Sequence, residues 1–157
     1  MHKIFFMINL KSIQDFLANT EIAVVGASDN KKKFGNIVLN KLKDNGYTVY
    51  PVNPRLTEVD GIKCYANIES LPETVCAAVF ITKPEITEKI TVQICEKKLI
   101  NHLWFQEGSE SNYVIQVALS NNRNLIYGEC IMMFLKSSGF PHNFHKLIKK
   151  SLGKYPK

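Results

Sequence analysis

The sequence predicts an α/β fold, a Rossmann-like, doubly wound parallel sheet of about five strands with helices on both faces. Two observations predict this class. Short, wholly apolar runs such as residues 22–25 and 75–81 are typical of strands covered on both faces. Segments with helical periodicity separate these runs, and strands that alternate with helices pair in parallel through right-handed crossovers.

Length and composition indicate one domain. The 157 residues are 45% hydrophobic and 22% charged, as in ordinary globular chains. We therefore expect a single domain over residues 1–157, with its core at about 20–135 and a basic amphipathic helix at 136–157. The apolar run at 4–8 is too short for a signal peptide or a membrane span, so we expect no stable membrane insertion. Whether Met1 or Met7 is the true start stays open.

The first predicted element is a short lead-in helix. Residues 12–15 have the S-x-x-D spacing of a capping box, which predicts a helix that begins at Ser12. Its buried side would carry Ile13, Phe16 and Leu17. The strand at 22–25 follows.

A second helix should follow that strand and its loop. Apolar residues recur there at i, i+3, i+4 and i+8: Phe34, Ile37, Val38 and Leu42. Gly46 marks the end of this helix. The next strand, 48–52, stops at Asn53 and Pro54 because proline cannot donate to a sheet ladder.

A second strand-to-helix junction begins at residues 75–81. Pro84 suits the first turn of a helix, with Glu85 and Glu88 near its positive end. Isoleucines then recur every fourth residue: Ile86, Ile90 and Ile94. Residues 102–105 and 124–127 are predicted strands. The helix at 113–119 between them should start at Ser109 or Ser111, and a last helix should follow Pro141.

Ligands of open parallel sheets bind outside the carboxyl ends of the strands, near the point where the strand order reverses. The loops at Gly26, Asn53, Thr82 and Gln106 should therefore converge. Gly26 allows a tight turn, the start of the next helix attracts phosphate, and the lysines at 31–33 add positive charge.

This first loop departs from the dinucleotide fingerprint G-x-G-x-x-G. Ser28 replaces the second glycine, and the third is displaced to Gly35. NAD enzymes also usually place Asp or Glu after the second strand, whereas this chain has Arg55 there. A cation favours an additional ribose phosphate, as in NADP or coenzyme A. The alternative is a rigid turn with a solvated arginine.

Several motifs together resemble a known family. They keep their order and spacing across residues 20–135, at 22–28, 33–35, 46–54, 61–65, 71–72, 104–108 and 129–132. The chain resembles the stand-alone CoA-binding domain proteins, which are related to the amino-terminal domain of the succinyl-CoA synthetase alpha subunit. The resemblance implies coenzyme A or an acyl-CoA as ligand. The synthetase's phosphorylated histidine lies in a second domain, so its chemistry should not transfer, and we expect no enzymatic activity.

The resemblance also implies which residues bind each part of the ligand. Those around the diphosphate would be Gly26, Ala27, Ser28, Lys33, Phe34 and Gly35. Those beside the ribose phosphate would be Asn53, Pro54 and Arg55. Thr82, Lys83 and Pro84 would flank the adenine, although the family usually has a different dipeptide at the first two. Glu107 and Gly108 would lie beside the pantetheine arm.

No catalytic or metal-binding residue is predicted. Ser28 is interpreted as a helix-start residue that bonds backbone N–H groups, and Cys130 as a packed core residue. A mixed disulfide between Cys130 and coenzyme A stays open. His142 and His145 have i, i+3 spacing on a helix but no evident third ligand.

Charge and cysteine content leave two rival functions. The net charge is +6, with lysines gathered at 31–33 and 146–157, which allows an interaction or nucleic-acid-binding protein. A solvated basic tail explains the second group equally well, so no nucleic-acid partner is predicted. The other rival is an NADP-binding oxidoreductase or redox sensor. The four cysteines form no C-x-x-C pair, which favours a cytoplasmic location with free thiols. A homodimer stays open.

Overall fold

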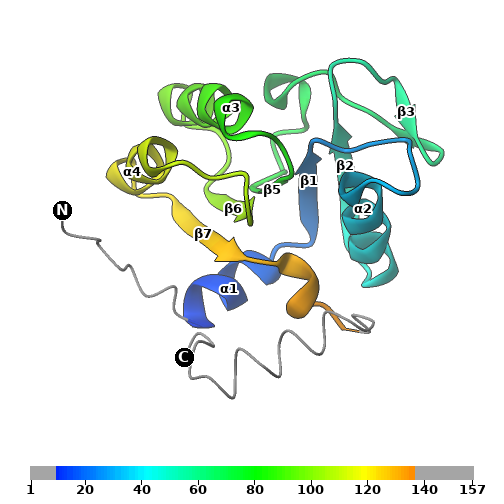
Figure 1. The fold of residues 1–157 in the computed structure, drawn as a ribbon, viewed down its shortest axis with the longest axis horizontal. Coiled ribbons are helices and arrows are strands. Elements are labelled where there is room, and N and C mark those ends of the chain that lie inside the picture. The colour runs from blue at the N-terminus through cyan, green and yellow to red at the C-terminus, as the bar shows by residue number, and fades with distance from the viewer. Residues whose placement is uncertain (1–9, 137–157) are drawn as a thin grey trace.

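A computed structural model of the chain describes residues 10–136. Five parallel strands form one sheet in the order β2-β1-β5-β6-β7 (Figure 1). Its strands are β1 (Glu21–Val25), β2 (Thr48–Val52), β5 (Ala77–Phe80), β6 (His102–Gln106) and β7 (Asn124–Glu129). The helices are α1 (Leu10–Leu17), α2 (Phe34–Asp44), α3 (Pro84–Glu96) and α4 (Asn112–Ser120), with short 3₁₀ turns η1 (Ile68–Ser70) and η2 (Ile131–Met133). The predicted fold class is confirmed.

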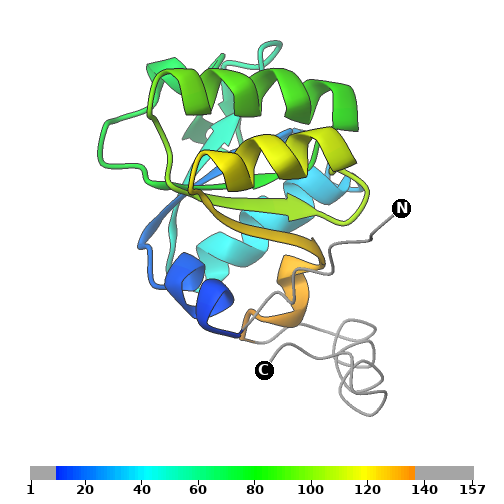
Figure 2. The same cartoon turned by 90° about the vertical axis from the view of Figure 1, so that its left-hand side faces the viewer.

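Two apolar cores lie on opposite faces of the sheet. On one face, α1, α2 and η2 pack around Trp104, whose ring meets Phe16 edge-on at 5.3 Å between centroids. On the other, α3 and α4 pack over a core that includes Phe80 and Phe105. Figure 2 shows these two helices together on one side of the sheet. Each fully buried side chain of this size stabilises the fold by about 1.5–3 kcal/mol. Burial on both faces is why the strands are apolar throughout.

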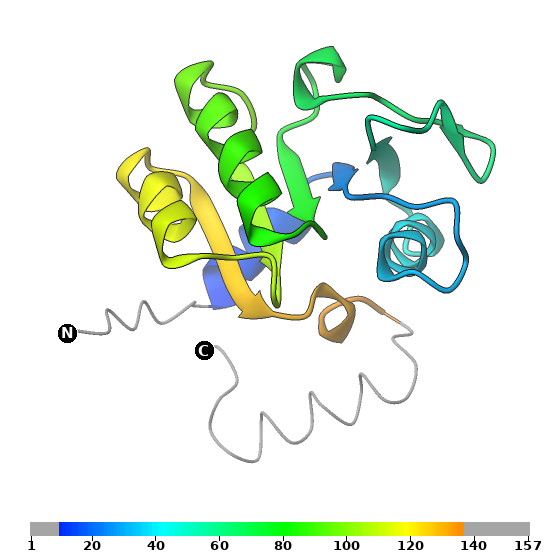
Figure 3. The same ribbon diagram turned by 45° about the horizontal axis from the view of Figure 1, so that its top comes forward.

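The strand order reverses at β1, which pairs with β2 on one side and with β5 on the other. The connections on the two sides of this point therefore leave the sheet in opposite directions, with α2 on one face and α3 beside α4 on the other (Figure 3). This divergence opens a space at the carboxyl end of β1, and it positions the site described below.

A small antiparallel hairpin lies beyond β2, formed by β3 (Glu58–Val59) and β4 (Ile62–Lys63). Its turn residues Asp60 and Gly61 have φ of 52° and 78°. Two successive residues with positive φ make the turn that Asp-Gly favours in hairpins. This hairpin was not predicted from the sequence, although an Asp-Gly pair is a typical signal for such a turn. Figure 1 shows β3 at the right, apart from the main sheet.

Two helix faces differ from the prediction. In α2, Val38, Leu39 and Leu42 are buried but Ile37 is 40% exposed. In α3, Ile86 is 46% exposed and the buried residues before Ile94 are two threonines, Thr87 and Thr91. The predicted stripe is buried at Ile94 and packs against the core at Ile90, but it is wrong at Ile86, where the neighbouring Thr87 is buried instead. The hydroxyl of Thr87 is satisfied there by the Lys83 carbonyl, at 3.2 Å.

Of the helix starts predicted for α1, α3 and α4, two are confirmed and one is wrong. α3 begins at Pro84, as predicted, and Ser111 caps α4 by accepting a hydrogen bond from the Val114 N–H at 3.2 Å. The start predicted at Ser12 was wrong, because α1 already includes Leu10 and places Ser12 inside the helix. The helix predicted after Pro141 and the basic segment 146–157 lie outside the described residues.

Candidate functional site

A hollow of about 310 Å³ lies at the carboxyl end of β1, where the strand order reverses. We call it the switch-point hollow. Its lining residues come from the ends of β1, β2 and β5 and from the start of α2: Gly26, Ala27, Ser28, Lys33, Phe34, Gly35, Asn53 and Ile81. The six residues predicted around a diphosphate are all among them, together with Asn53. Ile81 was not predicted to line the site. It does so because it directly follows the end of β5.

Glycine is required at two positions because three backbone segments touch there. A Cβ at Gly26 would lie 2.4 Å from the Ile81 carbonyl oxygen, and Gly26 itself has φ of 90°. A Cβ at Gly35 would lie 2.2 Å from the Gly26 carbonyl oxygen. These contacts bring the start of α2 directly onto the end of β1. They explain why Gly35 is displaced along the sequence yet still serves close helix–strand packing.

The loop between β1 and α2, residues 26–33, is held by two asparagine side chains. We call it the glycine loop. The Asn53 amide donates to the Ala27 carbonyl at 2.8 Å, and the Asn36 amide donates to the Ser28 carbonyl at 2.8 Å. In a trans peptide the N–H points opposite to the C=O. The next two N–H groups, of Ser28 and Asp29, therefore point away from the asparagines, and the two carbonyl oxygens are held by hydrogen bonds within the protein.

The start of α2 also suits an anion. Its N-cap, Lys33, has extended φ and ψ of −82° and 144° and makes no side-chain capping bond, in contrast to Ser111 of α4. A helix amino terminus without a side-chain cap is an attractive site for a phosphate, and Lys33 adds positive charge at the hollow. Ser28 does not start this helix: its hydroxyl accepts from the Asn30 N–H inside the glycine loop at 3.1 Å.

The carboxylate of Asp60 reaches the same loop from the β3–β4 hairpin. It pairs with Lys31 and accepts from the amides of Asn36 at 2.9 Å and Asn40 at 2.8 Å. Hydrogen bonds from Asn40, then Lys31, and also Asn36 lower the pKa of Asp60 to about 2, although burial raises it. These partners of Asp60 were not predicted from the sequence. All three lie twenty or more residues from Asp60, and two of them lie on a helix face that carries polar residues.

The turn after β2 lies beside the hollow. The Asn53 N–H donates to the Tyr65 carbonyl at 2.9 Å, while its side-chain oxygen accepts from the Arg55 N–H at 2.9 Å. Pro54 and Arg55 are exposed and do not line the hollow. Arg55 is thus adjacent to the hollow, and its contact with a ribose phosphate stays a prediction.

The loop after β5 meets the glycine loop, as predicted. A Cβ added at Gly26 would lie 3.0 Å from the Thr82 methyl group, and the Thr82 and Thr87 hydroxyls are 2.7 Å apart. Lys83, like Lys33, is an N-cap without a side-chain capping bond, here followed by Pro84. Thr82, Lys83 and Pro84 do not line the hollow. Their contact with an adenine stays a prediction.

The loop after β6 contributes no residue to the lining of the switch-point hollow. The side chain of Gln106 is buried and accepts from the Ile131 N–H at 3.1 Å, which ties this strand end to η2. The Gly108 N–H donates to the Glu110 carboxylate at 2.9 Å. Glu107 and Gly108 are exposed and lie outside the hollow. Three of the four predicted loops are in contact around Gly26, and a contact of Glu107 and Gly108 with the ligand stays a prediction.

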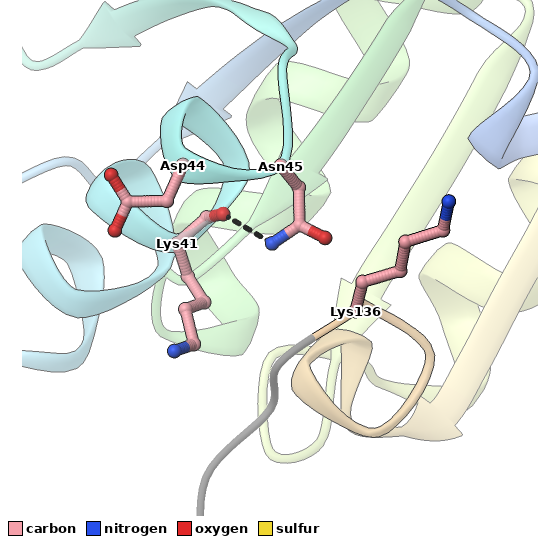
Figure 4. A pocket seen from close by; sticks show the side chains of 4 residues that line it. All are labelled: Lys41, Asp44, Asn45 and Lys136. Carbon is pink, nitrogen blue, oxygen red and sulfur yellow. Dashed lines mark hydrogen bonds between the residues drawn. The ribbon is translucent and has the colours of Figure 1, made fainter.

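A second hollow, of about 360 Å³, lies at the far end of α2 (Figure 4). It is lined by Lys41, Asp44, Asn45 and Lys136. Asn45 donates to the Lys41 carbonyl at 2.8 Å, and the two lysine side chains extend in opposite directions. Lysine here complements the negative carboxyl end of the helix. This hollow is separated from the glycine loop by the length of α2.

The described residues contain neither a metal-binding cluster nor a membrane-spanning helix. Among residues 10–136, no group of three His, Cys, Asp or Glu side chains could hold a metal, and His142 and His145 lie outside this range. No helix within the same range is both long and apolar enough to cross a bilayer. The cysteines Cys64, Cys76, Cys95 and Cys130 are free thiols.

Comparison with known proteins agrees with this geometry. The sequence profile of the family described as "CoA binding domain" matches residues 20–136. A solved structure of a conserved hypothetical protein from Pyrococcus furiosus is 37% identical, with a TM-score of 0.69, over 73% of this chain and 97% of that one. The uncharacterized protein YneT of Bacillus subtilis is 26% identical over 70% of this chain and 81% of its own length.

Larger proteins match over a shorter segment. The ADP-forming acetate–CoA ligase I of Archaeoglobus fulgidus is 35% identical over 77 residues, which are 49% of this chain and 11% of the ligase. The chain thus spans about a tenth of the length of that ligase.

Proposed function

The chain belongs to the family of CoA-binding domains, and on that premise we propose that it binds coenzyme A or an acyl-CoA in the switch-point hollow without catalysing a reaction. The observation that carries the proposal is the glycine loop, whose carbonyls are tied back by Asn53 and Asn36. The loop presents N–H groups beside a helix amino terminus without a side-chain cap. Such a surface is suited to a diphosphate.

Each part of the site has a distinct role in this proposal. The loop N–H groups and the start of α2 bind the diphosphate, and Lys33 neutralises part of its charge. Arg55, adjacent to Asn53, binds the ribose phosphate that distinguishes coenzyme A from its dephosphorylated form. Gly26 and Gly35 have no side chain, so the phosphate can approach the backbone closely.

The lining of the hollow is small, apolar or amide side chains with Ser28 and one lysine, which suits the binding of a phosphate group. It contains no carboxylate, imidazole or thiol that could act as a base or nucleophile. The Ser28 hydroxyl accepts a hydrogen bond from a backbone N–H and has no general base among the lining residues. Ligase activity belongs to proteins about ten times longer than the matching segment, and we do not assign it to this chain.

Isothermal titration with coenzyme A, acetyl-CoA, dephospho-CoA, NADP and NAD tests the proposal. We expect micromolar binding of coenzyme A, weaker binding of dephospho-CoA and no comparable binding of NADP. Lys33→Met should weaken coenzyme A binding about tenfold, since it removes a charged hydrogen bond to phosphate. Lys43→Met, on the exposed far part of α2, is the matched control and should bind like the wild type.

Binding of NADP without coenzyme A would instead support the oxidoreductase or redox-sensor alternative. The nucleic-acid alternative predicts binding to a duplex of arbitrary sequence that weakens steeply with salt and is indifferent to Lys33→Met.

A further inference from the structure

The β3–β4 hairpin places one carboxylate against the glycine loop and α2 at once. Asp60 pairs with Lys31 of the loop and accepts from Asn36 and Asn40 of α2. The Asp60 side chain is only 16% exposed, whereas that of Lys31 is 70% exposed. Nothing in the hollow itself requires this contact, because Asp60 is not among its lining residues.

We propose that Asp60 is a positioning residue for ligand binding: it holds the glycine loop in its ligand-ready conformation and occupies Lys31, which leaves Lys33 to face the ligand. The proposal rests on the proposed function. It assigns a role in recognition to a hairpin outside the hollow.

The orientation of the Asn36 amide links Asp60 to the glycine loop. Asn36 is 2% exposed, and its NH₂ group donates both to Asp60 and to the Ser28 carbonyl. A carboxylate only accepts hydrogen bonds, so Asp60 requires the NH₂ group, and not the oxygen, on its side of Asn36. The same orientation ties back the Ser28 carbonyl and turns the next N–H outward. Asp60 thereby fixes a loop peptide that it does not touch.

Asn40 reinforces this orientation of the Asn36 amide. Its NH₂ group donates to Asp60 and also to the Asn36 side-chain oxygen at 3.0 Å. Both amides are thus oriented by one carboxylate, and every contact in the chain from Asp60 to Ser28 has its donor and acceptor assigned. Buried networks of this kind hold one conformation when all members are satisfied.

The two loop lysines have different surroundings. Lys31 is bound to Asp60, so its charge is compensated, whereas Lys33 lines the hollow. If Lys31 only positions the loop, removal of the whole neutral pair in Lys31→Met with Asp60→Asn should weaken binding without changing how steeply affinity falls with salt. Removal of Lys33 should flatten that salt dependence, because an attraction to phosphate that salt screens is lost.

Asp60→Asn is a clean variant for the test. Asparagine tolerates positive φ, as the φ of 52° at this turn requires, and it has nearly the same shape. It removes the charge and supplies an NH₂ group that can bond the Asn36 oxygen in a flipped orientation. Glu58→Gln, at an exposed position of the same hairpin, is the matched control.

The experiment combines titration with coenzyme A and hydrogen exchange of the free protein. We expect Asp60→Asn to bind about tenfold more weakly and to exchange faster at residues 27–33 but not in β5, while Glu58→Gln matches the wild type in both. Lys31→Met combined with Asp60→Asn removes a neutral ion pair and should weaken binding with an unchanged salt slope, whereas Lys31→Arg alone should bind like the wild type. Unchanged affinity and exchange in Asp60→Asn would overturn the proposal.

A second result would also overturn it. If the variant that lacks both charges of the pair flattened the salt slope as Lys33→Met does, Lys31 would contact the ligand instead of positioning the loop. Urea denaturation of this variant establishes that it is folded, so that the slope reports on the ligand. Failure of the wild type to bind coenzyme A would be a separate outcome, which overturns the proposed function itself.

Discussion

The side-chain amide of Asn53 donates to the Ala27 carbonyl at 2.8 Å, which ties the end of β2 to the loop after β1. The same side chain accepts from the Arg55 N–H, and the Asn53 N–H donates to Tyr65. Asn53 therefore fixes the position of the glycine loop and of the Arg55 turn. It also links both to the segment at Tyr65 that borders β2. The relative placement of two proposed phosphate contacts depends on this residue.

Asn53→Asp should impair both binding and stability. The new carboxylate would face the Ala27 carbonyl without a donor, and it would place negative charge beside the proposed phosphate site. We expect the free energy of unfolding to fall by about 1–3 kcal/mol and coenzyme A affinity to fall at least tenfold. Urea denaturation and titration measure the two effects. Asn112→Asp, at the exposed first turn of α4, should leave both unchanged. Equal affinity in Asn53→Asp would contradict the role given to this residue.

Gly35→Ala should be more destabilising than its ordinary backbone conformation suggests. Its Cβ would lie 2.2 Å from the Gly26 carbonyl oxygen, so β1 and α2 must separate. We expect a loss of about 2–3 kcal/mol, at the upper part of the range for overpacking. Gly46→Ala is the comparison: its φ is 89° but nothing lies within 4 Å of the added Cβ. That variant should lose only about 1 kcal/mol. A reversed order in urea denaturation would show that backbone strain outweighs the close contact.

The sequence was sufficient for the sheet because each strand is buried on both faces and is therefore apolar along its whole length. It was not sufficient for the first turn of α3. Ile90 and Ile94 of the predicted stripe pack in the core, but Ile86 is exposed. Thr87 is buried in its place because a nearby carbonyl and Thr82 satisfy its hydroxyl. Periodicity reports apolar spacing and does not register such local hydrogen bonds.

The candidate site was predictable where its signals are local in the sequence, and not where they depend on contacts between distant elements. Glycines and lysines in the first loop are local signals, and all six residues predicted there line the switch-point hollow. The network of Asp60, Asn36 and Asn40 is formed by polar residues from two elements that meet only in the folded chain. Nothing in the spacing of those residues indicates that they share one carboxylate.

The low pKa of Asp60 predicts acid sensitivity of the native state. Hydrogen bonds from Asn40 and Lys31 lower the pKa to about 2 from an ordinary 3.8. A lowered pKa stabilises the fold above the ordinary value, and this contribution is lost as the pH falls from about 4 to about 2. We expect a contribution of about 1 kcal/mol at neutral pH, since the partner Lys31 is exposed and screened. The stability difference between wild type and Asp60→Asn should shrink over this range. A constant difference in urea denaturation would contradict the assignment.

Stability should also depend on the protonation of His102. Burial lowers the pKa of His102, although Asp15 opposes this, and the Asn124 amide lies 3.0 Å from its Nδ1. Because Asn124 also donates to the Ser12 carbonyl at 3.0 Å, it links His102 to α1. The geometry requires Nδ1 to accept, which a protonated imidazole cannot do.

The sign of this effect follows from the lowered pKa. Near pH 6 the unfolded chain binds more protons at this site than the native chain, so stability rises with pH up to about the ordinary value of 6.5 and is then constant. His102→Gln keeps an acceptor for Asn124 and does not titrate. The stability of wild type relative to His102→Gln should therefore decrease as the pH falls from 7 to 5 in urea denaturation, while the histidines common to both proteins cancel. A relative stability that rose on acidification would mean that Asp15 dominates, and that His102 is protonated in the native state.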